Sequence, residues 1–236
     1  MKTVLITGAN RGIGREAARQ FVVAGYRVFA GVRNLEKGKA DWGVLPSGPG
    51  HIEFVVLDVT NPASVTVAAE ELSALVPHLD ALVNNAGISG LPHLDRTSIE
   101  NLRAVFETNF FGVVMVTQAF LPLLRRGPEP RIVNVSSGLG SLTGQSDPTW
   151  EYYPFKSAYF TSKTALNAYT VWLAYDLRDA PFKVNAIDPG YTATEFNNFR
   201  GPGKVEDAAA VVVKYATLSG EGPTGGFFDR DGKLAW

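Results

Sequence analysis

The sequence predicts an α/β protein built on a single doubly wound parallel sheet of about seven strands, with helices on both faces. Short β-branched runs alternate with longer helical patterns along the whole 236-residue chain. The runs are almost continuously hydrophobic, which is typical of strands buried on both faces. Nothing in the chain resembles a linker or an internal repeat, so we expect one domain over residues 1–236.

Each element can be placed from its pattern of apolar residues. Strands are predicted at Val4–Thr7, Arg27–Val32, Ile52–Val59, Ala81–Asn84, Arg131–Val135, Lys183–Ile187 and Gly225–Phe228, and helices near 12–24, 62–76, 98–126, 158–179 and 205–218. Pro122 predicts a kink in the third helix.

Charge and composition exclude several classes of partner. The 22 Lys and Arg nearly cancel the 23 Asp and Glu, so no general field would attract nucleic acid or an anionic membrane. The most apolar run, Phe110–Leu124, is broken by polar residues and Pro122, which favours a buried helix over a membrane span. The three histidines lie far apart without metal-ligand spacing, so no metal site is expected.

The compartment can also be predicted from the sequence. The chain has no cysteine, which fits a reducing environment. It begins Met1-Lys2 and enters the first strand at once, leaving no room for a signal peptide. We therefore expect a cytoplasmic protein.

A glycine-rich connection follows the first strand and opens an amphipathic helix. Glycines there permit a tight turn and let backbone N–H groups approach a pyrophosphate at the helix N-terminus. A glycine-rich loop alone could be only a turn, but this strand-turn-helix context predicts a Rossmann-type dinucleotide site. Its contacts would be Gly8, Asn10, Arg11, Gly12, Ile13 and Gly14.

A phenol and an ammonium lie four residues apart at Tyr159 and Lys163, on one face of a predicted helix. A nearby cation favours the phenolate, so we expect Lys163 to lower the pKa of Tyr159. Tyr159 would then be a usable proton donor and acceptor near neutral pH. The alternative is that the tyrosine packs in the core while the lysine is a solvated charge.

Several motifs together resemble the short-chain dehydrogenase/reductase family, from residue 3 to about residue 195. They are Gly-x3-Gly-x-Gly from Gly8, Asn84-Asn85-Ala86-Gly87, Asn109, Ser137, Tyr159-x3-Lys163 and Asp188-Pro189-Gly190. The segment Gly225–Phe228 also looks like the last strand of such proteins.

The resemblance implies catalytic roles for four residues. Tyr159 would supply a proton, and Ser137 would hydrogen-bond the substrate oxygen, with Ser136 as the competing serine. Lys163 would anchor the nicotinamide ribose and hold the pKa of Tyr159 down. Asn109 would open its helix to a proton-relay water; without the resemblance it would be a surface amide or a helix-kink residue.

Cofactor choice follows from charge at the end of the second strand. An acid there selects NAD, whereas arginine suits the 2′-phosphate of NADP. Val32 occupies the place of the acid, and Arg33 and Arg11 follow on the same side, which favours NADP unless both are solvated surface charges. The resemblance adds cofactor contacts at Asp58, Val59, Asn85, Ala86, Gly87, Tyr159, Lys163, Pro189, Gly190, Thr192 and Thr194.

Ser137 and Tyr159 are separated by more than the family's usual spacing, so an insertion lies roughly within Gln145–Lys156. Its aromatic residues would line an apolar substrate pocket or pack at the surface or on another subunit. An insertion here resembles the carbonyl-reductase branch, which implies an NADPH-dependent reductase of ketones, aldehydes or quinone-like carbonyls, reversible to alcohol oxidation.

Two other functions stay open. One is a biosynthetic reductase, for example of 3-oxoacyl thioesters. The other is a module that binds NADP without turnover, although a sensor has no need of a serine and a tyrosine aimed at a substrate oxygen. The sequence does not identify the substrate, the product stereochemistry or the oligomeric state, and a homo-oligomer is possible.

Overall fold

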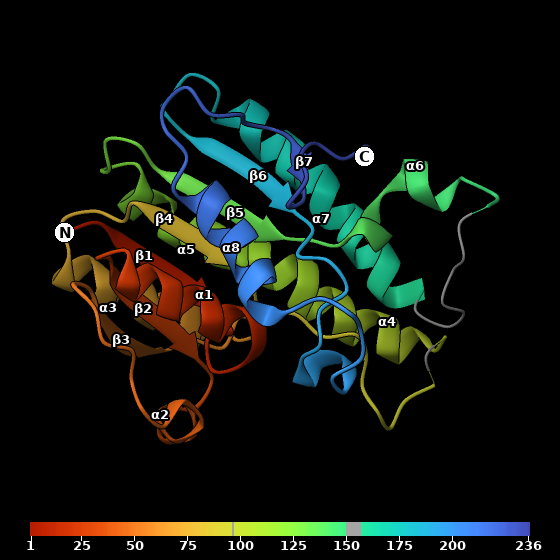
Figure 1. The fold of residues 1–236 in the computed structure, drawn as a ribbon, viewed down its shortest axis with the longest axis horizontal. Helices are drawn as coiled ribbons and strands as arrows, with labels where there is room; N and C mark the ends of the chain where they lie inside the picture. The colour runs from red at the N-terminus through yellow and green to blue at the C-terminus, as the bar shows by residue number, and fades with distance from the viewer. Residues whose placement is uncertain (96, 150–156) are drawn as a thin grey trace.

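Seven strands form one parallel sheet, which confirms the predicted fold class (Figure 1). The computed structural model describes residues 1–95, 97–149 and 157–236. The strand order is β3-β2-β1-β4-β5-β6-β7. The strands are β1 (Thr3–Thr7), β2 (Arg27–Val32), β3 (His51–Val56), β4 (Ala81–Asn84), β5 (Arg131–Val135), β6 (Lys183–Ile187) and β7 (Phe227–Phe228).

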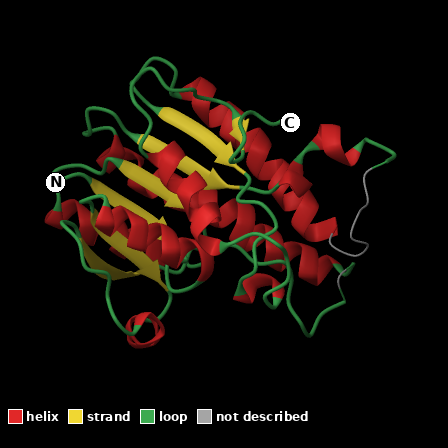
Figure 2. Ribbon diagram, viewed as in Figure 1, coloured by secondary structure: helices red, strands yellow, loops and turns green. Residues whose placement is uncertain are grey.

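The helices cover both faces of this sheet (Figure 2). They are α1 (Gly12–Val23), α2 (Leu35–Trp42), α3 (Pro62–Leu75), α4 (Ile99–Phe106), α5 (Gly112–Leu124), α6 (Leu142–Gln145), α7 (Ser157–Asp176) and α8 (Val205–Ala216). Buried residues of α1 and α8 pack on one face, and those of α3, α5 and α7 on the other. The sheet therefore has a separate hydrophobic core on each side.

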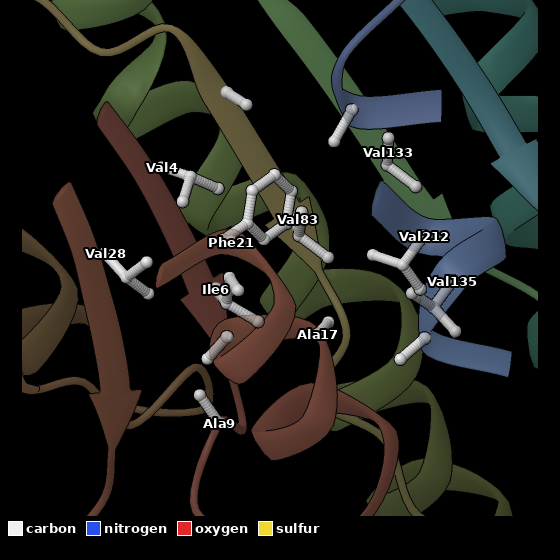
Figure 3. Packing of buried hydrophobic residues seen from close by; sticks show 14 of the residues in the cluster. Val4, Ile6, Ala9, Ala17, Phe21, Val28, Val83, Val133, Val135 and Val212 are labelled. Atoms are coloured by element: carbon white, nitrogen blue, oxygen red, sulfur yellow. The ribbon is translucent and has the colours of Figure 1, made fainter. Parts of the chain in front are cut away.

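The core under α1 shows why the first helix is amphipathic. Phe21 is fully buried and lies among Val4, Ile6 and Val83, which come from β1 and β4 (Figure 3). Burying a side chain of this size stabilises the fold by about 1.5–3 kcal/mol. This packing fixes α1 over the junction of β1 and β4.

That junction is the point where the strand order reverses. From β1 the sheet continues to β2 and β3 on one side and to β4 on the other. In doubly wound folds a ligand binds in the crevice outside the carboxyl ends of the strands at this point. Here those ends carry Thr7 and Asn84, so the glycine-rich loop and the Asn85 segment start side by side.

Helix α2 was not predicted from the sequence. Asn34 caps it by accepting a hydrogen bond from the Lys37 N–H at 2.8 Å. Its buried residues are Gly38 and Trp42, and the Trp42 indole donates to the Ala9 carbonyl at 2.9 Å. The helix is only eight residues long and mostly polar, so its apolar pattern was too short to reveal it.

The predicted helix near 98–126 is observed as α4 and α5 joined by a π-helical turn, Glu107–Phe111. Pro122 lies inside α5. By length and composition the stretch Ile99–Leu124 could cross a membrane, with a mean hydropathy of 1.4 and 39% of its apolar window buried. This is weak support for a span, because core helices pass the same test.

We expect Gly50→Ala to destabilise the fold. An added Cβ would lie 2.2 Å from the Tyr26 carbonyl oxygen and 2.7 Å from that of Val22, and both obstacles are backbone. Overpacking of this kind costs about 1–3 kcal/mol, so the melting temperature should fall by several degrees. In the control, Gly220→Ala, the Cβ meets the Glu129 carboxylate, which can move. Equal melting temperatures for the two variants would contradict the expectation.

Candidate active site

A cavity of about 1270 Å³ lies along the carboxyl ends of the strands. Every cofactor contact predicted from the sequence lines it, from Gly8 in the first loop to Thr194 beyond β6. Ser137, Tyr159 and Lys163 line the same cavity. The structure therefore brings the dinucleotide motifs and the serine-tyrosine-lysine set into one site.

The glycine-rich loop forms a cradle that larger residues would fill. Gly8 and Gly12 have φ angles of +65° and +53°, which L-residues with side chains rarely adopt. A Cβ on Gly14 would lie 2.6 Å from the Gly8 carbonyl oxygen and 2.4 Å from Asn85 Nδ2. Asn85 in turn donates to the carbonyls of Thr7 and Gly8, at 2.9 and 3.2 Å.

The N-terminus of α1 is open toward this cradle. Arg11, at the N-cap, is extended and makes no side-chain cap bond, and the first turn holds no acid. The first N–H groups of a helix lack intrahelical partners and favour an anion. The loop, the missing cap and the size of the cavity fit the pyrophosphate of a dinucleotide.

A cluster of polar and basic residues lines the cavity beside the end of β2. Arg11 and Arg33 are exposed, and neither forms an ion pair with a described residue. Lys37, which the sequence analysis missed, lines the same wall and pairs with Asp41 at 2.7 Å. Asp41 also accepts from Asn10 Nδ2 at 3.0 Å. The signal for Lys37 was its position four residues after Arg33, in the segment that follows the second strand.

The two neighbouring serines have different partners. Ser136 Oγ is buried and donates to Asn167 Oδ1 at 2.6 Å. Ser137 lies close enough to Tyr159 for its hydroxyl to lower the pKa of the phenol, and Ser137 Oγ accepts from the Leu139 N–H at 3.2 Å. The geometry therefore favours Ser137 as the serine that can reach a substrate oxygen.

Replacing each serine should separate these roles. Ser137→Ala removes a hydroxyl aimed at the reacting oxygen, so kcat/KM for carbonyl reduction should fall about 10-fold or more. Ser136→Ala breaks the bond to Asn167 and should lower the melting temperature more than the rate per folded molecule. Steady-state kinetics and thermal melts of both variants check this. A larger rate loss in Ser136→Ala would contradict it.

Tyr159 and Lys163 are both buried on α7, one turn apart. Lys163 Nζ donates to the Val135 carbonyl at 2.7 Å and lies 5.6 Å from the centroid of the Tyr159 ring. Burial lowers the pKa of Lys163 to about 8.

The expectation that Lys163 lowers the pKa of Tyr159 is wrong for this structure. Burial raises the pKa of Tyr159, and the charge of Asp188 raises it further, while the nearby Ser137 hydroxyl opposes both. Removing the phenolate from water costs more free energy than the polar groups around it recover. In this state Tyr159 keeps its proton at neutral pH.

Asn109 lies in the π-helical turn and is fully buried, outside the residues that line the cavity. Its side chain accepts from the Ile88 N–H and donates to the Ile88 carbonyl and to Ser162 Oγ, at 2.8, 2.9 and 3.0 Å. A methyl group on Gly87 would lie 3.3 Å from Asn109 Oδ1 and 3.8 Å from Lys163 Nζ. Asn109 thus braces the helices that carry the site.

The segment after β6 closes over the tyrosine. The ring of Phe196, which the sequence analysis did not assign to the site, lies 5.6 Å from that of Tyr159, centroid to centroid. Thr194, predicted to contact the nicotinamide, lies near the glycine-rich loop, because a Cβ on Gly12 would be 3.5 Å from its Cβ. The aromatic residues of the predicted insertion, Trp150, Tyr152, Tyr153 and Phe155, lie outside the described residues.

A dinucleotide cradle in one cavity with a serine, a buried tyrosine and a buried lysine is typical of nicotinamide-dependent oxidoreductases. The family model for short chain dehydrogenases matches residues 2–204. The chain therefore belongs to the short-chain dehydrogenase family, whose members act on CH–OH and C=O groups.

Proteins of similar sequence and structure are consistent with this family assignment. The chain is 37% identical to the short-chain dehydrogenase anuI of Penicillium roqueforti, covering 91% of this chain and 88% of the relative. It is 34% identical to (-)-isopiperitenone reductase of Mentha piperita, covering 98% and 97%. The structure of NADPH-bound carbonyl reductase from chicken fatty liver matches with a TM-score of 0.83 and 27% identity, covering 100% and 99%.

Proposed function

We propose that the protein is an NADPH-dependent reductase of ketones, aldehydes or quinone-type carbonyls, able to run in reverse as an alcohol dehydrogenase. The observation that carries this is that Ser137, Tyr159 and Lys163 line the same cavity as Arg11 and Arg33. One cavity thus combines a proton donor with a basic wall for a phosphate.

The residues that would hold NADPH follow from this cavity. The glycine-rich loop and the start of α1 suit the pyrophosphate, and Arg11 and Arg33 suit the 2′-phosphate. Asp58 and Val59 would border the adenine, and the Pro189–Thr194 segment would hold the nicotinamide amide. When bound, NADPH supplies a hydride to the carbonyl carbon.

Hydride addition places negative charge on the carbonyl oxygen, and the protein must stabilise and then protonate it. The Ser137 hydroxyl is placed to donate a hydrogen bond to that oxygen, and Tyr159 is placed to transfer its proton. Because burial raises the pKa of Tyr159, the phenol is already protonated at neutral pH. The phenol is therefore in the protonated form that carbonyl reduction requires, although the raised pKa makes it a weaker acid than a phenol with a pKa near neutral pH.

Lys163 and Asn109 would assist Tyr159 rather than contact the reacting oxygen. Lys163 is one helical turn from Tyr159 and lines the cavity, where its ammonium can bond a ribose hydroxyl. Asn109 belongs to a π-helical turn, which interrupts the regular backbone ladder. We propose that this turn binds the water molecule through which Tyr159 regains its proton.

The substrate end of the cavity favours apolar carbonyl compounds. Leu139, Tyr191 and Phe196 line it near Ser137 and Tyr159. The relatives named above for isopiperitenone and for carbonyl reduction support the same class of substrate. A cytoplasmic location and a possible homo-oligomer stay predictions from the sequence.

The proposal is tested by following NADPH and NADH consumption across a panel of small ketones, aldehydes and quinones. Turnover with NADPH on several apolar carbonyls supports it. Tight NADPH binding without turnover on any of them would favour the sensor instead, and turnover confined to 3-oxoacyl thioesters would favour the biosynthetic reductase.

A further inference from the structure

Asp41 is an acid among the cations that line the cavity beside the end of β2. It lines the same wall as Arg11, Arg33 and Lys37. Lys37 Nζ donates to Asp41 Oδ1 at 2.7 Å, and Asn10 Nδ2 donates to Asp41 Oδ2 at 3.0 Å. Each oxygen of this carboxylate therefore binds one hydrogen-bond donor of the wall.

The end of α2 is fixed to the glycine-rich loop, which keeps Asp41 in this wall. Trp42, the next residue, is buried, and its indole N–H donates to the Ala9 carbonyl at 2.9 Å. The Trp42 carbonyl accepts from Arg15 Nη2, also at 2.9 Å. Because neither bond uses the carboxylate, Asp41 can be replaced without releasing α2 from the loop.

The two donors that Asp41 binds also suit a phosphate. An ammonium and a side-chain amide N–H both donate to phosphate oxygens, and bonds between opposite charges are the stronger ones. The bonds from Lys37 and Asn10, together with the charge of Arg11, hold the pKa of Asp41 below its usual value, so the carboxylate is ionised at neutral pH. A phosphate at this wall therefore meets a like charge and a competitor for the same donors.

We propose that Asp41 is a specificity-determining residue that competes with the 2′-phosphate of NADPH for Lys37 and Asn10 and so limits the preference for NADPH over NADH. The inference rests on the proposed function, because it assigns the basic wall to the 2′-phosphate. Asp41 is distinct from the acid that selects NAD at the end of the second strand, since Val32 holds that place and Asp41 lies on α2.

The test is the binding of NADPH and NADH to Asp41→Ala, measured by isothermal titration calorimetry. We expect the Kd for NADPH to fall about 5-fold and the Kd for NADH to stay within about 2-fold of the wild type, because only NADPH carries the additional phosphate. The gain should shrink at high salt, since these side chains are accessible to solvent. Asp41→Asn, which keeps the shape of the side chain, should change the ratio in the same direction.

Glu36→Ala is the matched control. Glu36 is an exposed acid on the same helix, and it does not line the cavity. Its ratio of the two dissociation constants should match the wild type. The proposal is overturned if Asp41→Ala changes both constants by the same factor, which a purely structural role predicts, or if Glu36→Ala shifts the ratio as much.

A second measurement asks whether the gain depends on Lys37. Lys37→Ala should weaken NADPH binding more in the Asp41→Ala background than in the wild type, because Asp41 no longer occupies the ammonium there. Equal costs in the two backgrounds would contradict competition for this donor.

Two smaller probes separate this inference from the proposed function. Adenosine 2′,5′-bisphosphate and AMP differ only in the 2′-phosphate, and their binding does not depend on turnover. If the wild type binds the bisphosphate more tightly than AMP but Asp41→Ala leaves the ratio unchanged, only the role of Asp41 fails. A wild type that prefers AMP and NADH contradicts the NADP assignment, and the role of Asp41 then stands only if Asp41→Ala strengthens binding of the bisphosphate.

Discussion

Tyr159→Phe is expected to lower kcat for carbonyl reduction by about 10³-fold while leaving the affinity for NADPH within a few-fold of the wild type. The substitution removes only the phenolic O–H, which faces the cavity that Ser137 also lines. The ring is buried against Phe196 and should keep its place. Steady-state kinetics and NADPH fluorescence titration measure the two quantities separately.

Tyr175→Phe provides the control for this substitution. Tyr175 lies on the same helix, α7, but its side chain is 65% exposed and does not line the cavity. It should retain nearly full activity. If Tyr159→Phe kept more than about a tenth of the wild-type kcat, another group would be the acid, since general acid catalysis contributes about 10²–10⁴-fold.

The parallel sheet was predictable because its strands are buried on both faces. The bounds of β2 and β6 are the predicted ones, Arg27–Val32 and Lys183–Ile187, because neither run is interrupted by proline or aspartate. At the sheet edges the predicted strands are longer than the observed ones, since β3 ends at Val56 and β7 holds only Phe227–Phe228. Leu57 and Val59 stay buried beyond the end of β3, and a hydrophobicity pattern cannot distinguish a strand residue from a buried residue that follows the strand.

The site was predictable where a motif fixes backbone geometry, as at Gly14, whose Cβ would clash with its neighbours. It was not predictable where the effect depends on burial. The pair Tyr159 and Lys163 alone suggested a lowered tyrosine pKa, whereas desolvation and Asp188 raise it. Phe196 was missed because its contact with Tyr159 forms only when the segment after β6 packs against α7, and the sequence does not show that packing.

Cofactor preference provides the second large effect. The double variant Arg11→Ala with Arg33→Ala should lose about 10²-fold in kcat/KM for NADPH and little for NADH. Bonds between guanidinium and phosphate are worth about 1.5–3 kcal/mol each, and solvent at these exposed positions screens part of that. NADH lacks the 2′-phosphate, so it cannot lose these bonds.

The comparison needs a control for the loss of surface charge near α2. Lys39→Ala removes a cation from the same helix at an exposed position that does not line the cavity. Its ratio of kcat/KM for NADPH to that for NADH should match the wild type. A double variant with an unchanged ratio would show that Arg11 and Arg33 are solvated charges, and Arg15 and Lys37, which also line the cavity, would then be the cations to test. A wild type that prefers NADH would contradict the NADP assignment directly.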